Sequence, residues 1–96
     1  MNWDDVRIFL AVARTGQILA ASRRLELNHA TVSRRITALE SDLQSKLLIR
    51  RTNGCDLTQE GEAFMHAAER MEAEMLAARA AVGRTDTEVS GTVRIG

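Results

Sequence analysis

The stretch from Asn28 to Thr37, NHATVSRRIT, combines short polar side chains with two arginines. Arginine can form two hydrogen bonds to a guanine, and serine and threonine hydroxyls can contact bases or phosphates. Short side chains would let a helix that begins here come close to base edges, and its N-terminal amides would suit a phosphate. The stretch is therefore a candidate for contact with a nucleic acid.

A helix is predicted from Asn28 to about Leu43. The Asn28 side chain is a good N-cap, because it can accept a hydrogen bond from the amide of residue 30 or 31. Apolar residues at helical spacing predict its buried stripe, which consists of Val32, Ile36, Leu39 and Leu43. At 100° per residue the opposite face holds the residues that we expect to be exposed: Ala30, Ser33, Arg34, Thr37 and Ser41, with Thr31 and Arg35 on its flanks.

Two helices are predicted before this one. The first ends at Gly16 in a left-handed cap, and its apolar face is made of Trp3, Val6, Phe9, Leu10 and Ala13. Ile8 and Val12 lie off that face, so they are either incidental surface residues or the edge of an oligomer contact. Residues 18–25 form the second helix, and residues 26–28 are a tight connection to the third.

A hairpin is predicted over residues 47–58, LLIRRTNGCDLT. The apolar start favours a strand, Asn53-Gly54 is a strong turn signal, and Leu57 lies in a short return strand. The result would be a small two-stranded wing that carries Arg50 and Arg51.

A long helix is predicted from residue 59 to Gly83, with Thr58 as its cap. It would span about 24 residues and roughly 36 Å. Its apolar residues recur in heptad steps and predict a seam of Phe64, Ala68, Met71, Met75, Ala78 and Val82. A helix with such a stripe either folds back on the core of its own domain or pairs with a second helix. We favour a dimer, because the helix is too long to bury the whole stripe against so small a domain.

The remaining residues differ in composition. Residues 84–90 are polar and hinge-like, and residues 91–96, GTVRIG, alternate like the start of a strand. We therefore expect a winged unit over 1–58, a dimerisation helix over 59–83, and the hinge and first strand of a further domain over 84–96.

Charge is divided unevenly along the chain. Residues 1–58 hold nine Arg and Lys against six Asp and Glu, and residues 59–96 hold four against seven. A basic half joined to an acidic helical half suggests a polyanion-binding module to which a helical arm is appended. On charge alone, an ordinary solvated surface is the alternative.

Other functions find little support in the sequence. Cys55 is the only cysteine, so no internal disulfide can form, and with His29 and His66 it makes no metal spacing. The sequence shows no nucleophile–base pair and no phosphate-binding glycine loop, so we expect neither an enzyme nor a cofactor. With neither a signal peptide nor an apolar span, a cytoplasmic protein without a membrane partner is expected.

The order and spacing of these motifs resemble the N-terminal winged helix-turn-helix domain of LysR-type transcriptional regulators of bacteria. The similar segments are the Phe9-Leu10 helix ending at Gly16, the Ala21 helix, TVSRRITALE (31–40), LLIRR (47–51), LTQEG (57–61) and GTVRIG (91–96). The resemblance implies a mainly α fold of three helices and a two-stranded wing, followed by a long dimerisation helix.

The resemblance also implies a function. Such a domain binds double-stranded promoter DNA, with the recognition helix in the major groove and the wing on the adjacent backbone or minor groove. It forms a homodimer through antiparallel linker helices, and the full-length protein is often a tetramer whose further domain binds a small-molecule effector. The alternative is a protein-interaction module, in which the long helix is the working surface and the helix-turn-helix is only a packing unit.

Carried onto this sequence, the resemblance assigns roles to individual residues. Base reading falls to His29, Thr31, Ser33 and Arg34. Contacts to the backbone or from the wing fall to Ala30, Arg35, Thr37, Arg50, Arg51 and Asn53. The dimer interface is expected to hold Ile8, Val12, Phe64, Ala68, Met71, Met75 and Ala78. Val32 is excluded from the contacts because it belongs to the buried stripe.

Several of these positions have alternatives. His29, Ser33 and Arg34 could instead be surface residues that contact no base. For Arg35 the alternative is an ion pair with Glu40 or Asp42.

The sequence also departs from the family pattern at three positions. His29 stands where the family usually has Gln, Ala30 replaces a frequent Pro or Ser, and Asn53 stands where a basic residue is common. The last departure shifts the charge of the wing onto Arg50 and Arg51.

Overall fold

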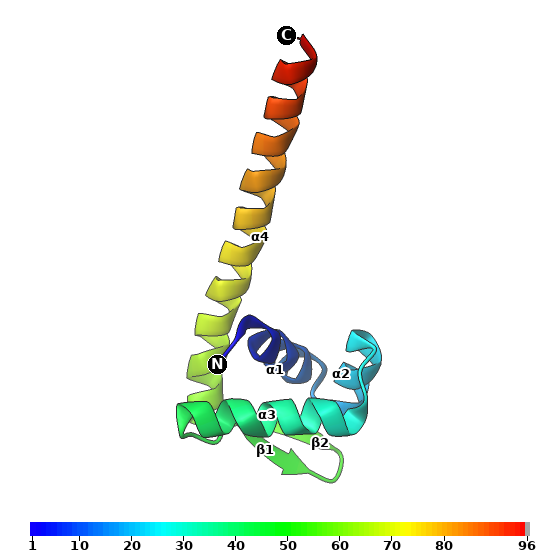
Figure 1. Ribbon diagram of the computed structural model, residues 1–96. Helices are drawn as coiled ribbons and strands as arrows, with labels where there is room; N and C mark the ends of the chain where they lie inside the picture. Colours follow the sequence, from blue (N-terminus) through cyan, green and yellow to red (C-terminus); the bar gives the residue numbers. More distant parts are fainter. Residues whose placement is uncertain (96) are drawn as a thin grey trace.

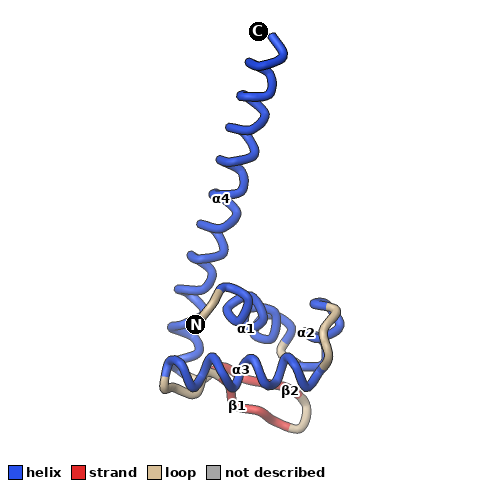
Figure 2. The backbone as a smooth tube through the Cα atoms, viewed as in Figure 1, coloured by secondary structure: helices blue, strands red, loops and turns tan. Residues whose placement is uncertain are grey.

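Helices dominate the computed structural model, which describes the backbone of residues 1–95 and the side chains of residues 1–83. Within those residues the elements are α1 (Trp3–Thr15), α2 (Ile18–Leu25), α3 (His29–Leu43), β1 (Leu48–Arg51), β2 (Gly54–Leu57) and α4 (Gln59–Ile95). The hairpin lies against the domain below α3, and α4 leaves the domain past α1 (Figures 1 and 2). The predicted order of three helices, wing and long helix is confirmed.

The first three helices begin and end where their local sequence predicts. Gly16 closes α1 in a left-handed conformation with φ of 75°. The Asn28 side chain accepts a hydrogen bond of 2.7 Å from the Ala30 amide and so caps α3. Glu26 takes the left-handed conformation at the end of α2, which makes the connection to α3 tight. The helix-turn-helix unit therefore arises from caps that act within a few residues.

The core corrects the prediction for Ile8 and Val12, whose exposed fractions are 1% and 0%. Both belong to the core that α1 shares with α2, α3 and the wing, so neither can line a dimer interface. The physical reason is that α1 is packed on two sides. Val6 and Leu10 face α4, while Ile8 and Val12 face the rest of the domain. A helix that is covered on two sides has no single apolar face.

The first part of α4 also folds onto its own domain. Ala68 is fully buried against Val6 and Leu10, and the Phe64 ring meets Phe9 edge to face with centroids 5.2 Å apart. The expectation that Ala68 belongs to a dimer seam is therefore wrong, because no part of it is exposed, whereas for the half-buried Phe64 it stays a prediction. Folding back on the core, the alternative for such a stripe, holds for this half of the helix.

The start of α4 is set by two residues of the LTQEG motif. The Thr58 hydroxyl accepts a hydrogen bond of 2.9 Å from the Gly61 amide and donates one of 2.6 Å to the Lys46 carbonyl. A Cβ at Gly61 would lie 2.0 Å from the Leu47 carbonyl oxygen. The helix can therefore begin directly against the chain that leads into the wing only because residue 61 is a glycine.

The far end of α4 differs from the prediction. The helix does not end at Gly83 but continues to Ile95, through the predicted hinge and strand. An isolated glycine costs a helix only about 1 kcal/mol relative to alanine, and this stretch has no proline to stop it. The side chains of residues 84–96 lie outside the described part, so the assignment of this stretch to a further domain stays a prediction.

Candidate nucleic-acid interface

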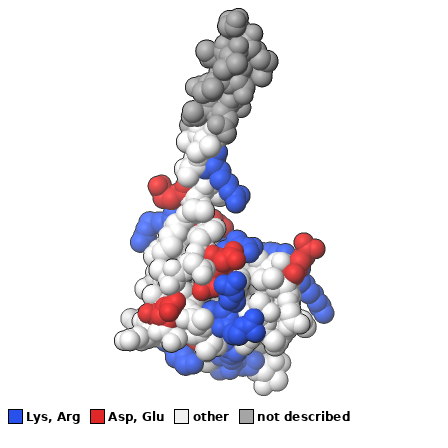
Figure 3. Space-filling view, in the orientation of Figure 1, with Lys and Arg blue, Asp and Glu red and all other residues white. Residues whose placement is uncertain are grey.

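The exposed face of α3 carries the side chains that its periodicity predicts. His29, Ala30, Arg34 and Thr37 are exposed, whereas Thr31 and Ser33 are half-buried. Val32, Ile36 and Leu39 hold the opposite face in the core. Figure 3 shows lysine and arginine side chains gathered over the part of the domain that contains α3 and the wing. This surface is positive, and small side chains lie at the exposed beginning of the helix.

Two side chains on this face are available for a ligand. Neither His29 nor Arg34 has a hydrogen-bonded or ion-paired partner among the side chains that the structure describes. Both lie soon after the Asn28 cap, where the amides of the first turn of α3 point outward. A free guanidinium and a free imidazole beside open backbone amides can bind phosphate oxygens or the acceptor atoms of bases.

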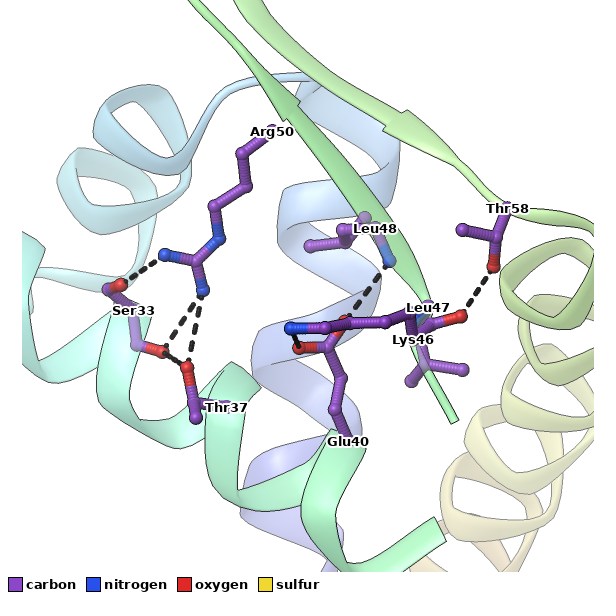
Figure 4. A network of polar contacts seen from close by, with 8 residues as sticks. All are labelled: Ser33, Thr37, Glu40, Lys46, Leu47, Leu48, Arg50 and Thr58. Atoms are coloured by element: carbon purple, nitrogen blue, oxygen red, sulfur yellow. Dashed lines mark hydrogen bonds and ion pairs between the residues drawn. The ribbon is translucent and has the colours of Figure 1, made fainter. Parts of the chain in front are cut away.

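Arg50 reaches from the wing to α3 (Figure 4). Its Nη1 donates a hydrogen bond of 2.6 Å to the Ser33 hydroxyl, and its Nη2 lies 3.4 Å from the Ser33 carbonyl oxygen and 3.5 Å from the Thr37 hydroxyl. The predicted contact residues Ser33, Thr37 and Arg50 are thus brought together. Their hydrogen bonds connect the two elements that were expected to contact a ligand separately.

The wing itself is a tight hairpin whose register pairs Arg50 with Cys55 and Arg51 with Gly54. The two-residue connection is Thr52-Asn53, one residue earlier than the Asn53-Gly54 signal suggests. Arg51 forms an ion pair with Asp56 on the exposed side of the hairpin.

A groove of about 570 Å³ separates the wing from the first residues of α2 and α3. It is lined by Gln17, Ile18, Leu19, His29 and residues 50–55. Burial in it raises the pKa of the Cys55 thiol, and the nearby Arg50 charge opposes that effect. At neutral pH this cysteine is therefore protonated and contributes no charge to the groove.

Arg35 is not paired with Glu40 or Asp42, the alternative that its position suggested. Its Nη1 donates a hydrogen bond of 2.8 Å to the Asp5 carboxylate, which is buried at the start of α1. An aspartate so removed from water needs a partner, and Arg35 supplies it. The structure thus gives Arg35 a role in holding α3 on α1.

Glu40 is a structural residue that the sequence analysis missed. It is 7% exposed, and its Oε2 accepts hydrogen bonds from the Leu47 amide at 2.8 Å and the Leu48 amide at 3.2 Å (Figure 4). These bonds attach the beginning of the wing to the end of α3. A signal was present, because Glu40 lies four residues after Ile36 on the buried stripe, where a carboxylate needs an internal partner.

A second surface lies beside α1. A largely apolar groove of about 740 Å³ runs between the first residues of α1 and the middle of α4. It is lined by Met1, Asn2, Trp3, Val6, Ala67, Arg70, Met71, Glu74, Met75 and Ala78. Of the predicted seam, Met71, Met75 and Ala78 are therefore accessible from outside the domain, unlike the buried Ala68.

Among the side chains of residues 1–83, no group of three His, Cys, Asp or Glu could hold a metal ion. No helix within the described part of the chain is long and apolar enough to cross a membrane.

Comparison with known proteins agrees with this arrangement. A family described as "Bacterial regulatory helix-turn-helix protein, lysR family" matches residues 3–62. The transcriptional regulator GltR of Bacillus subtilis (strain 168) is 36% identical over 96 residues, which are all of this chain and 32% of GltR. The chain thus spans about a third of the length of this relative.

Solved structures of DNA-bound domains are also similar. The DNA complex of the CbnR DNA-binding domain superposes with a TM-score of 0.80 at 33% identity, over 91% of this chain and 99% of that one. The BenM DNA-binding domain in complex with catB site 1 DNA has a TM-score of 0.84 at 26% identity, over 88% and 94% of the two chains.

Proposed function

This chain belongs to the LysR family of bacterial helix-turn-helix regulators and is a DNA-binding domain of that family, and from this premise we propose that it binds promoter DNA at specific sequences. The recognition helix α3 enters the major groove, and the wing contacts the neighbouring backbone or minor groove. The observation that carries the proposal is the exposed start of α3, where His29 and Arg34 have no partner among the described side chains.

The geometry supports a division of labour along α3. His29, Thr31 and Arg34 read bases, and the small Ala30 lets the helix approach them. Ser33 and Thr37 hold Arg50, and Arg35 holds α3 against α1. Arg50, Arg51 and Asn53 contact the sugar-phosphate backbone from the wing, because they lie on its exposed edge beside the groove that begins at His29.

The active form in this proposal is a homodimer, for which the apolar groove beside α1 provides the surface. Met75 is 38% exposed at the edge of this groove, and Leu76 and Val82 are exposed farther along α4. Packing against another apolar helix stabilises an exposed helix with so many apolar residues, because it removes their side chains from water. We assign the interface to Met71, Met75 and Ala78 with Trp3, and the partner helix is α4 of a second copy in antiparallel orientation.

A dimer places two recognition helices on one DNA molecule. They address half-sites about 34 Å apart, or they bend the DNA to reach them. The protein works in the cytoplasm, where bacterial DNA is, and catalyses no reaction. From the family resemblance we also propose that the whole regulator carries an effector-binding domain for a small molecule and forms a tetramer.

A binding experiment tests the DNA-binding role. We would select duplexes from a random library with this protein and measure affinity for a selected and a random duplex over a range of salt concentrations. Arg34→Ala should cost about 1–3 kcal/mol on the selected duplex and relax the preference at one base pair. Equal loss on both duplexes would make Arg34 a phosphate contact, and no binding by the wild-type protein at low salt would favour the interaction-module alternative.

The dimer is tested separately by sedimentation. Met75→Glu puts a charge into the apolar groove and should shift the protein to monomer, with weaker binding to duplexes that contain two half-sites. Ala77→Glu is the matched control, since Ala77 is also exposed on α4 but lies on the opposite side of the helix. Loss of the dimer in both variants, or in neither, would contradict the assigned interface.

A further inference from the structure

The wing is connected to two different parts of the domain through a single cross-strand pair. Arg50 and Cys55 lie opposite each other in the hairpin. The Cys55 amide points away from β1 and donates a hydrogen bond of 2.7 Å to the Gly16 carbonyl, in the turn between α1 and α2. The Arg50 side chain reaches the other way, to Ser33 on α3. The two connections hold the hairpin between the α1–α2 turn and the recognition helix.

The connection to the α1–α2 turn depends on a missing side chain. A Cβ on Gly54 would lie 2.6 Å from the Gly16 carbonyl oxygen, where an ordinary contact needs at least 3.4 Å. The wing or the turn would have to move by the difference, about 0.8 Å, because the Gly16 oxygen belongs to the backbone and not to a flexible side chain. The φ of Gly54, 157°, is also one that other residues rarely adopt.

The tip of the wing has a further connection to the same turn. The Gln17 side-chain amide donates a hydrogen bond of 3.3 Å to the Asn53 carbonyl. Gln17 and Asn53 are both exposed, so this bond contributes little to stability but restrains the direction of the tip. Together, the connections determine the width of the groove in which His29 lies.

We propose that Gly54 and Arg50 are positioning residues for DNA binding, because they set the separation between the wing and the recognition helix before DNA arrives. The inference rests on the DNA-binding role proposed above. A wing held at a fixed distance from α3 loses little freedom on binding, so a single spacing between major-groove and flanking contacts is favoured. A freely moving wing would have to be ordered anew in each complex, at a cost in binding free energy.

The position of the wing can be measured without DNA. Spin labels on Thr52→Cys at the wing tip and Ser41→Cys on α3, in a Cys55→Ser background that keeps the residue 55 amide, report the distance between the two elements by pulsed electron paramagnetic resonance. We expect a narrow distribution for the parent and a longer, broader one after Gly54→Ala. Gly83→Ala is the matched control, since a Cβ there meets no atom within 4 Å, and it should leave the distribution unchanged.

The consequence for DNA is measured on the selected duplex. Gly54→Ala should weaken binding about tenfold or more, lower the salt slope by roughly 1 for each phosphate that the wing no longer reaches, and remove hydroxyl-radical protection on the flank that the wing covers. The base preferences under α3 should stay those of the wild type. A purely structural defect would weaken the whole complex uniformly and would not separate the flank from the centre.

The outcomes distinguish the inference from its premise. An unchanged distance distribution, or a changed distribution with wild-type affinity and footprint, would overturn the positioning role alone. Failure of the wild-type protein to prefer its selected duplex would overturn the proposed function. If Gly54→Ala does not fold, the double variant Gln17→Ala/Arg50→Gln takes its place in the distance measurement without DNA, because both side chains are exposed. A distribution like that of the parent would overturn the positioning role.

Discussion

Replacing Glu40 by alanine would remove a buried carboxylate that two backbone amides share. The Leu47 and Leu48 amides lie 2.8 and 3.2 Å from its Oε2, and both leucines are buried, so water has little access to the amides left behind. Each buried donor without a partner costs about 1–3 kcal/mol. The ion pair with Lys46 adds little, because the Lys46 side chain is almost fully in solvent.

We therefore expect Glu40→Ala to lower the free energy of unfolding by about 3 kcal/mol. A domain of this size has roughly 5–14 kcal/mol in total, so the Tm should fall by roughly 12–24 °C. Glu40→Gln keeps an oxygen that can accept both amide hydrogen bonds but removes its charge, so it should lose about half as much. The assay is urea and thermal denaturation followed by circular dichroism at 222 nm.

The control for this experiment is Glu74→Ala, which removes a carboxylate from an exposed position on α4. Its effect should stay within about 0.5 kcal/mol. The reasoning would be refuted if Glu40→Ala unfolded at the same urea concentration as Glu74→Ala. Hydrogen exchange provides a second criterion, since the Leu47 and Leu48 amides should lose protection in Glu40→Ala before the helices do.

Other predictions concern the remaining charges and the thiol. Arg35→Ala leaves the buried Asp5 without its partner and should lower the free energy of unfolding by about 1–3 kcal/mol. The value should lie toward the low end, because the Arg35 side chain is 37% exposed. Unchanged urea denaturation would show that the pair is not structural. The hydrogen bond from Arg14 lowers the pKa of Glu72 from 4.5, so their pair stabilises the fold above that pH and stops doing so as the pH falls below it. The Tm difference between wild type and Glu72→Gln at pH 7 should accordingly shrink as the pH falls below 4.5, and a difference that does not change with pH would contradict this. Burial raises the pKa of the Cys55 thiol above 9.0, so at pH 8 it should react with a disulfide reagent more slowly than in the urea-unfolded chain, and an equal rate would contradict this.

The helix-turn-helix unit was predictable from the sequence because its signals are local. The left-handed cap at Gly16, the Asn28 cap of α3 and the Thr58 cap of α4 act through hydrogen bonds within a few residues. The exposed face of α3 follows from helix geometry once Val32 and Ile36 are recognised as buried. The candidate contact residues of α3 could therefore be predicted before the fold was known.

The partners of charged residues were not predictable in this way. Arg35 could have paired with Glu40 or Asp42 nearby, but the fold places Asp5, thirty residues away, against it. Similarly, nothing in the sequence shows that Arg50 would reach Ser33, or that Gly54 would pack on a carbonyl of the α1–α2 turn. Such pairs depend on how distant elements approach one another, and each charge has several acceptable partners along the chain.

The long helix α4 shows most clearly which features the sequence predicts and which depend on the tertiary structure. Heptad spacing determined that α4 has an apolar stripe, because spacing is a property of the helix alone. Whether Ala68 faces Val6 of the same chain or a second molecule depends on where α1 lies, and only the tertiary structure decided this. Burial is a property of the whole fold: the same seam is core at Ala68, where α1 covers it, and surface at Met75, where α4 has left the domain.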